Sequence, residues 1–295
     1  MPNSSTHRPY IGVSGQKPDS HAVRMIMQRI RENGEEPVFL DRHAPVADVV
    51  ARCDGIVIAG NDFDIDPSEY GQEALPTTKI DADQSRSQFE RALVDAALEK
   101  KIPLMGICAG MQRINLSGSP QERGSLHQHV EGKDQREAHA NGHDSSLPLD
   151  SPYETITLEP DSLVHQLAGA DTIQENSMHH QAIDKVRKGL RVTAWADNGL
   201  AEAIEQEKDG PFADQLVLGV QWHPEFYASK ISANLFAHFT EKSREFAQHK
   251  TTERPSPVES VLAAGPRSDA VHSVADDGVV ALGARAQAHA DLALS

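Results

Sequence analysis

Two short segments of the chain combine residue types suited to nucleophilic catalysis. In the first, GICAGMQ at residues 106–112, Cys108 follows an apolar run and precedes a helical pattern. Small residues two positions before and two positions after a nucleophile permit the sharp strand-to-helix turn that exposes its side chain at a sheet edge. We therefore predict a nucleophile elbow at Cys108, with its thiolate stabilised by the N-terminus of the following helix. The simpler alternative is a buried free cysteine, because cysteine is among the most buried residue types.

The second segment, GVQWHPE at residues 219–225, supplies the base that a thiol nucleophile needs. His223 can take the thiol proton, and Glu225 can hold the imidazole in one tautomer and stabilise its cation. A single histidine after a strand is more often an ordinary surface residue. The occurrence of both segments in one chain favours a triad of Cys108, His223 and Glu225.

The elements that would position these segments are short apolar runs alternating with amphipathic helical patterns, which is typical of βα units around a parallel sheet. The first half predicts strands at residues 10–13, 37–40, 55–59 and 102–107. The second half predicts strands at residues 153–158, 190–196, 200–205 and 216–222, followed by a helix at residues 226–246. The expected fold is an α/β sandwich with a mostly parallel central sheet and extra antiparallel strands. Cys108 and His223 are expected at one edge of the sheet, where the carboxyl ends of parallel strands meet.

The chain divides by composition after Phe246. Residues 1–246 carry all the predicted elements and are expected to form one domain. Residues 247–295 contain no aromatic residue, isoleucine or methionine and are dominated by alanine, serine, proline and glycine. Such a segment cannot bury enough apolar area to offset the entropy of ordering it, so we expect a mostly disordered C-terminal tail. A short helix at residues 284–294 and a partner-binding role for the tail are alternatives.

The overall composition argues against several classes of protein. Apolar residues make up 38% and charged residues 24% of the chain, as in soluble globular proteins. No segment approaches the roughly 20 apolar residues that cross a bilayer, so a cytoplasmic protein without a membrane partner is expected. The net charge of −16 argues against a nucleic-acid partner. Two cysteines, Cys53 and Cys108, are too few for a disulfide framework, and Cys53 is expected to be a packed thiol.

Three further segments lead to a family resemblance: AGNDFDIDPSEYG at residues 59–71, GSLHQH at 124–129 and NSMHHQAI at 176–183. Together with the two segments above, they resemble the class I glutamine amidotransferase domains, which have a flavodoxin-like α/β sandwich. Within these domains the chain is most similar to the gamma-glutamyl-gamma-aminobutyrate hydrolase branch, classed as C26 peptidases. The resemblance spans about residues 8–246 and leaves the tail outside. It implies hydrolysis of a small gamma-glutamyl amide through a covalent thioester, without a metal or organic cofactor.

The resemblance also implies roles for individual residues. Cys108 matches the nucleophile, His223 the general base and then acid, and Glu225 the third member of the triad. The oxyanion hole would be formed by backbone N–H groups of Ala109 and of the turn at Gly60 and Asn61. Further positions are expected to bind the glutamyl group or to border the substrate cleft: Gln112, Asn176, His179, His180 and Gln181. The histidine pair could instead pack and cap a loop.

The chain departs from the family pattern at three places. Ala109 stands where an arginine is common, and Gly60-Asn61 stands where two glycines are common. Asparagine tolerates a positive φ better than most residues, so the turn can persist. The stretch at residues 116–123 is longer than the usual compact glycine turn and could reshape the entrance. These departures leave substrate preference and reactivity open, and the sequence does not identify the amine part of the substrate.

Two alternatives to a free-standing hydrolase remain. The chain could be the glutaminase subunit of an amidotransferase, in which case a separate synthase would be its partner. It could also be a catalytically silent protein that binds a glutamyl ligand. The oligomeric state is open, a homodimer included.

Histidine and acidic clusters raise the question of a metal site, and we predict none. Four histidines and one aspartate have suggestive spacings but lie in a polar stretch that predicts a loop: His127, His129, His139, His143 and Asp144. A second group resembles a calcium loop only superficially, since the glycine and terminal glutamate at the required spacing are absent: Asp62, Asp64, Asp66 and Glu69.

Overall fold

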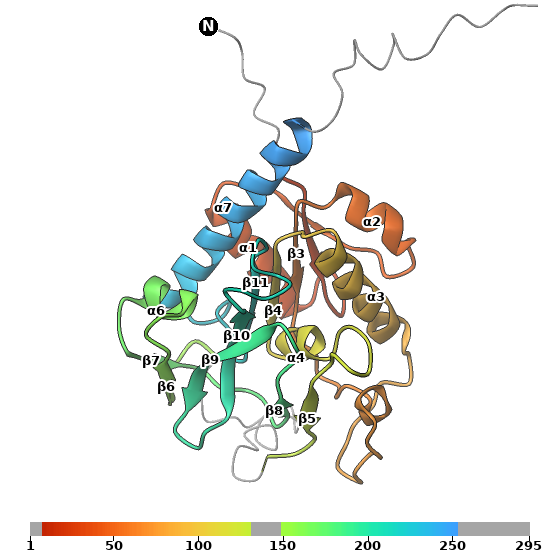
Figure 1. Cartoon of the computed structure of the whole chain (residues 1–295), viewed down its shortest axis with the longest axis vertical. Helices are drawn as coiled ribbons and strands as arrows, with labels where there is room; N and C mark the ends of the chain where they lie inside the picture. The colour runs from red at the N-terminus through yellow and green to blue at the C-terminus, as the bar shows by residue number, and fades with distance from the viewer. Residues whose placement is uncertain (1–7, 131–148, 253–295) are drawn as a thin grey trace, which may run out of the picture. The chain divides into compact units, whose positions relative to one another are not determined.

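The computed structural model describes residues 8–130 and 149–252, which belong to one compact unit built around a nine-stranded sheet (Figure 1). Five strands in one half are parallel to one another, in the order β2 (Pro37–Phe39), β1 (Ile11–Ser14), β3 (Gly55–Ile58), β4 (Leu104–Ile107) and β11 (Val217–Val220). Four antiparallel strands continue the sheet from β11, in the order β10 (Ala201–Gln206), β9 (Leu190–Ala196), β6 (Glu154–Leu158) and β7 (Thr172–Glu175). A separate antiparallel pair consists of β5 (Ser125–His127) and β8 (Ala182–Lys185).

Helices cover both faces of the sheet. One group comprises α1 (His21–Glu32), α6 (Leu163–Ala168) and α7 (Lys230–Thr252), whose buried side chains share one apolar core. The other group comprises α2 (Val46–Arg52), α3 (Ser85–Glu99) and α4 (Ala109–Asn115), which share a second core. A short 3-10 helix, η1 (Pro67–Tyr70), lies in the connection between β3 and α3.

The alternating direction of side chains along each strand explains why the sheet needs helices on both faces. In β3, Val57 faces the core shared by α1 and α7, whereas Ile56 and Ile58 face the core shared by α3 and α4. Successive side chains of a strand point to opposite faces of the sheet, so a strand made only of apolar residues must be covered on both faces. Full burial of each such side chain contributes about 1.5–3 kcal/mol to the free energy of folding. The edge at which the parallel strands end is therefore held by a rigid, two-sided core.

The predicted fold class is confirmed, and several elements differ in detail. Five elements were not predicted from the sequence: α2, α6, β5, β7 and β8. The closing helix starts four residues later than predicted, at Lys230, and runs to Thr252, past the expected domain boundary at residue 246. The boundary itself stays a prediction, because residues 253–295, including the segment 284–294 for which a short helix was an alternative, lie outside the described residues.

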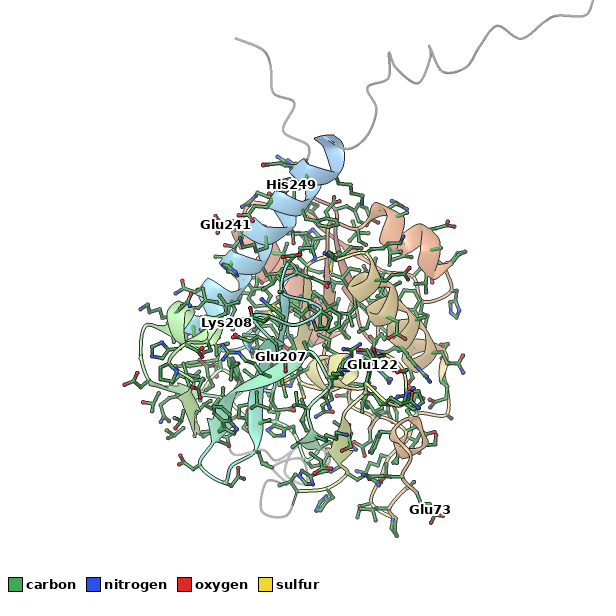
Figure 2. All side chains as sticks on the ribbon, in the orientation of Figure 1. Glu73, Glu122, Glu207, Lys208, Glu241 and His249 are labelled. Atoms are coloured by element: carbon green, nitrogen blue, oxygen red, sulfur yellow. The ribbon has the colours of Figure 1, made fainter. Side chains whose placement is uncertain are left out.

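Many charged side chains of the described residues project from the outside of the fold, among them Glu73, Glu122, Glu207 and Glu241 (Figure 2). None of the helices in the described ranges has the length and apolar character that a membrane span requires.

Candidate active site

Cys108 lies at the turn between β4 and α4, with a backbone φ of 52° and ψ of −111°. A positive φ is unfavourable for a residue with a Cβ atom, and such strain is often found at functional sites. The two flanking glycines make the turn possible. A Cβ atom on Gly106 would lie 2.5 Å from the backbone carbon of Gly110, and one on Gly110 would lie 2.0 Å from the carbonyl oxygen of Ile58. The spacing of small residues around Cys108 is thus a packing requirement of the turn.

The neighbouring strand β11 brings His223 to the same edge of the sheet. The register pairs Ile107 of β4 with Val220 of β11, and the backbone N–H of Cys108 donates a 2.8 Å hydrogen bond to the carbonyl of Val220. His223 follows three residues later and forms a hydrogen bond with the side chain of Cys108. The backbone of Gly60 packs closely against both residues. A Cβ atom on Gly60 would lie 2.9 Å from Cε1 of His223 and 3.7 Å from Cβ of Cys108.

Glu225 holds the other side of the His223 ring. Its Oε1 lies 2.8 Å from Nδ1 of His223, and its side chain is fully buried. An ionised carboxylate can only accept a hydrogen bond, so Nδ1 carries the proton and Nε2 is left for Cys108. The second carboxylate oxygen of Glu225 has no hydrogen-bond partner among the described residues. The charge of Glu225 therefore depends on the imidazole for its stabilisation.

The electrostatics of this group favour the protonated imidazole. Burial lowers the pKa of His223, but the charges of Glu225 and Cys108 and its hydrogen bonds to both outweigh burial. The net effect raises the pKa of His223 well above its usual value. Such an arrangement favours a thiolate beside an imidazolium, which is the reactive form of a cysteine nucleophile.

The backbone and the ring of His223 are each held in place. The amide of Asn176 accepts a 2.8 Å hydrogen bond from the His223 N–H and donates a 2.9 Å hydrogen bond to the His223 carbonyl. The ring of Phe226 stacks on the imidazole at a centroid distance of 5.4 Å, and His21 stacks on the Phe226 ring at 5.0 Å. Asn176, expected at the border of the cleft, thus acts on the position of His223.

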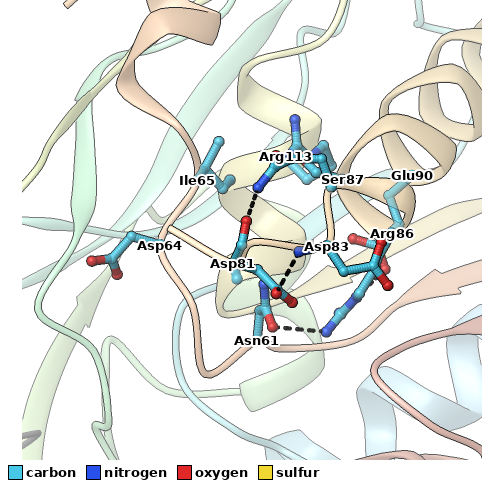
Figure 3. A pocket seen from close by; sticks show the side chains of 11 residues that line it. Asn61, Asp64, Ile65, Asp81, Asp83, Arg86, Ser87, Glu90 and Arg113 are labelled. Carbon is cyan, nitrogen blue, oxygen red and sulfur yellow. Dashed lines mark hydrogen bonds and ion pairs between the residues drawn. The ribbon is translucent and has the colours of Figure 1, made fainter. Parts of the chain in front are cut away.

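The turn at Gly60 and Asn61 is fixed by an arginine that was not predicted from the sequence. The guanidinium of Arg86 donates hydrogen bonds of 3.1 Å and 2.8 Å to the carbonyls of Ala59 and Gly60. It also donates one of 3.0 Å to Oδ1 of Asn61 (Figure 3). Its Nε atom donates to Glu90 at 2.9 Å. Arg86 and Glu90 lie on the buried face of α3, at the helical spacing of its apolar residues. Two charged residues on an otherwise apolar helix face are the signal that could have identified them.

A cavity of about 300 Å³ opens beside Cys108 and His223. Its walls include Gly60 and Asn61 from the turn, together with apolar side chains of α1 and of other segments: Ala22, Val23, Leu149, Met178 and Phe226. A volume of this order matches the small end of the range for ligand pockets. The cavity therefore fits a small molecule whose reacting atom meets the Cys108 thiol.

Comparison with known proteins gives the family. The model of the Peptidase C26 family matches residues 11–225, which is most of the chain. The chain belongs to the peptidase C26 family. It is 36% identical over 193 residues to a Schizosaccharomyces pombe protein provisionally named a glutamine amidotransferase, covering 65% of this chain and 70% of that protein. It is 33% identical over 210 residues to the gamma-glutamyl-gamma-aminobutyrate hydrolase of Escherichia coli O157:H7, covering 69% and 75%.

A solved structure shows the same fold at low sequence identity. The structure of a Thermoplasma acidophilum protein, provisionally described as a GMP synthase subunit, superposes with a TM-score of 0.54 at 13% identity. The match covers 83% of this chain and 99% of that one. The resemblance inferred from the sequence motifs is thereby confirmed at the level of family and fold.

In this C26 chain, four residues expected to bind substrate are buried and engage internal partners. Gln112 donates to the backbone carbonyl of Gln181 at 3.0 Å, and the side-chain oxygen of Gln181 lies 3.3 Å from the N–H of Ile65. His179 lies 3.3 Å from Glu202, and His180 lies 2.7 Å from Asp64. From the segment that contains the histidine pair, Met178 lines the cavity. A direct role of these four residues in substrate binding stays a prediction.

Of the histidines considered for a metal site, the two that the structure describes have different partners. His127 lies 3.6 Å from Asp184, and Nδ1 of His129 lies 3.3 Å from Nδ1 of His180. His139, His143 and Asp144 lie outside the described residues. A different group has ligand atoms close enough to share a cation, within 4.8 Å of one another: Glu154, His179 and Glu202. The contact of His179 with Glu202 also fits a simple ion pair.

The acidic loop after β3 serves mainly to hold neighbouring segments together. Asp64 accepts a hydrogen bond of 2.8 Å from the N–H of Lys79, and Asp66 accepts one from the N–H of Ser68 at the start of η1. Glu69 forms a 2.5 Å ion pair with Arg113 of α4.

Cys53 is fully buried, as expected of a packed thiol. Burial, with a smaller contribution from the charge of Asp54, raises its pKa to about 12. At neutral pH Cys53 is therefore an uncharged, unreactive thiol.

Proposed function

We propose that this C26 protein is a cysteine-dependent amide hydrolase that cleaves the gamma-glutamyl amide of a small amine. The observation that supports the proposal is the position of Cys108, on a strained turn at the wall of a cavity, in hydrogen-bond contact with a His223 imidazole held by Glu225. The relatives named gamma-glutamyl-gamma-aminobutyrate hydrolase support the same substrate class.

In the first half of the proposed reaction, the Cys108 thiolate attacks the gamma-carbonyl carbon and forms a carbon–sulfur bond. The carbonyl oxygen becomes an oxyanion, for which backbone N–H groups of Ala109 and of the turn at Gly60 and Asn61 would be the donors. When the adduct collapses, the carbon–nitrogen bond breaks and the His223 imidazolium gives its proton to the leaving amine. The products of this half are the free amine and a glutamyl thioester on Cys108.

In the second half, the neutral His223 accepts a proton from water as the water oxygen attacks the thioester carbonyl. The carbon–sulfur bond then breaks, glutamate leaves, and the electron pair returns to sulfur. Thiolate and imidazolium are restored together, which matches the elevated pKa of His223 in the resting site.

The experiment compares wild type, Cys108→Ala and the matched control Cys53→Ala on three substrates: gamma-glutamyl-gamma-aminobutyrate, gamma-glutamylputrescine and glutamine. Wild type and Cys53→Ala should release glutamate from at least one conjugated amine, and Cys108→Ala should be at least about 10⁴-fold slower. Hydroxylamine should trap the thioester of wild type as a gamma-glutamyl hydroxamate. Unchanged hydrolysis by Cys108→Ala, or no hydrolysis by any of the proteins, would contradict the proposal.

A second candidate is the glutaminase subunit of an amidotransferase, which the relative named as a glutamine amidotransferase supports. The chemistry at Cys108 would be the same, with ammonia as the leaving group and a separate synthase as the partner. Glutamine hydrolysis that is slow alone and rises when a co-purifying subunit binds would favour this candidate. Absence of Cys108 labelling by a glutamine-mimicking electrophile would instead indicate a catalytically silent binding protein.

A further inference from the structure

Gln221 contacts the sulfur atom of Cys108. Its Nε2 atom lies 3.5 Å from Sγ, a distance typical of an N–H donor to sulfur. Gln221 is fully buried, and it directly follows Val220, the residue whose carbonyl accepts the Cys108 N–H. The backbone N–H of Gln221 is itself bonded to the carbonyl of Glu202 at 2.8 Å, which anchors the residue to β10.

The hydrogen-bond network determines which end of the Gln221 amide faces the sulfur. Nε2 of Gln112 lies 3.0 Å from the backbone carbonyl oxygen of Gln181 and 3.1 Å from Oε1 of Gln221. A backbone carbonyl can only accept, so this end of Gln112 must be the amino group. An amino group in turn requires an acceptor on Gln221, which leaves the Gln221 amino group to face Cys108.

The same carbonyl of Gln181 also accepts from Nδ1 of His179 at 2.9 Å, which reinforces its role as an acceptor. Gln112 is buried as well, with 3% of its surface exposed. An amide in such a position does not exchange its hydrogen-bond partners with water. The donor aimed at the sulfur is therefore built into the core next to the cavity.

We propose that Gln221 is a further catalytic residue, whose amide N–H stabilises the Cys108 thiolate, and that Gln112 is the positioning residue that fixes its orientation. A thiolate accepts this hydrogen bond more strongly than a thiol does, because hydrogen bonds to charged groups are the stronger ones. The donor thus lowers the pKa of Cys108 and stabilises the sulfur as it leaves the thioester. The inference rests on the proposed nucleophilic role of Cys108.

The test measures the rate of alkylation of the full-length protein by iodoacetamide as a function of pH. Wild type is compared with Gln221→Met, which keeps the side-chain length and removes the donor. Cys53 does not contribute to the signal at neutral pH, because its pKa is about 12 and its side chain is buried. Gln215→Met is the matched control: Gln215 is also buried and donates to the carbonyls of Ala97 and Ile102.

Loss of the donor should raise the pKa of Cys108 by about one unit, which lowers the alkylation rate about 10-fold on the acid side of the wild-type titration and leaves the high-pH plateau unchanged. Gln215→Met should keep the wild-type profile even where it lowers thermal stability. Gln112→Met retains the Gln221 donor without its fixed orientation and should give a smaller shift in the same direction. A Gln221→Met profile identical to that of wild type would overturn the inference.

The measurement separates failure of this inference from failure of the proposed function. A shifted alkylation profile without any hydrolysis of gamma-glutamyl amides would support the Gln221 contact and contradict the hydrolase. Hydrolysis that depends on Cys108, together with an unshifted profile, would contradict the role of Gln221 alone.

Discussion

A Cβ atom on Gly110 would lie 2.0 Å from the carbonyl oxygen of Ile58, so helix α4 leaves the Cys108 turn in direct contact with the backbone of strand β3. Backbone atoms cannot move aside as the end of a flexible side chain can. The orientation of α4 relative to the sheet, and with it the strained backbone of Cys108, depends on the absence of one carbon atom.

Replacement of this glycine should therefore destabilise the protein. We expect Gly110→Ala to lower the free energy of unfolding by about 3 kcal/mol or more, since overpacking against fixed atoms is costly. For a domain of this size that corresponds to a decrease of about 6–12 °C in Tm. Gly199→Ala is the control: nothing lies within 4 Å of its Cβ position, and only its φ of 80° opposes the substitution. Equal Tm values for the two variants would contradict the packing argument.

Arg86 should affect the rate of reaction more than the binding of substrate. Arg86→Lys keeps the charge but cannot donate to the carbonyls of both Ala59 and Gly60 while also reaching Asn61. The turn at Gly60 and Asn61, proposed to bind the oxyanion, should lose its fixed geometry, and kcat should fall about 10- to 100-fold with a small change in KM. The measurement is steady-state kinetics on the best gamma-glutamyl substrate, with Arg31→Lys at an exposed ion pair as the control. An effect confined to KM would indicate a role in substrate binding instead.

Asn176 should matter through both of its hydrogen bonds to His223. Asn176→Asp retains the acceptor for the His223 N–H, but it has no donor for the His223 carbonyl and adds a buried negative charge. We expect a decrease of at least about 10-fold in kcat/KM, because a displaced imidazole transfers protons less efficiently. Wild-type kinetics with Asn176→Asp would show that the clamp on the backbone of His223 is dispensable.

Glu175 should make the stability of the protein depend on pH. Burial raises the pKa of this carboxyl to about 7, against a smaller opposing effect of its hydrogen bond from Ser229. Since the folded-state pKa is raised, the stability that Glu175 contributes is fully present below its unfolded pKa near 4.5 and is lost as the pH rises through about 7. The loss corresponds to about 3 kcal/mol at most.

Thermal unfolding of wild type and Glu175→Gln between pH 5 and pH 8.5 tests this prediction. The glutamine keeps an acceptor for Ser229 and cannot ionise, so the variant should be more stable than wild type at pH 8.5 and similar at pH 5. A constant difference in Tm across this range would contradict it.

The sequence was sufficient for the parallel half of the fold because the residue patterns that define its strands are local. Strands such as 55–59 and 102–107 are continuous apolar runs, and glycines around Cys108 mark a turn with a known steric requirement. The predicted boundaries differ from the structure by only one or two residues at these strands. Short elements such as β5 and β8 were missed because they form through pairing with each other, which no local pattern encodes.

The candidate site could be predicted only in part for a related reason. Cys108 and His223 follow adjacent parallel strands, a relation that topology alone can supply. The side chains that hold the surrounding site come from distant segments. Arg86 of α3 holds the turn at Gly60, Asn176 after β7 holds the backbone of His223, and Gln112 of α4 bonds Gln221. Their roles depend on which buried polar atoms meet after folding.

The stack of His21, Phe226 and His223 has a consequence for how the imidazole can move. Stacking opposes rotation of the His223 ring out of its plane and leaves only small displacements within that plane. Both proton transfers of a two-stage hydrolysis would then start from one resting position, without a rotamer change between acylation and water attack.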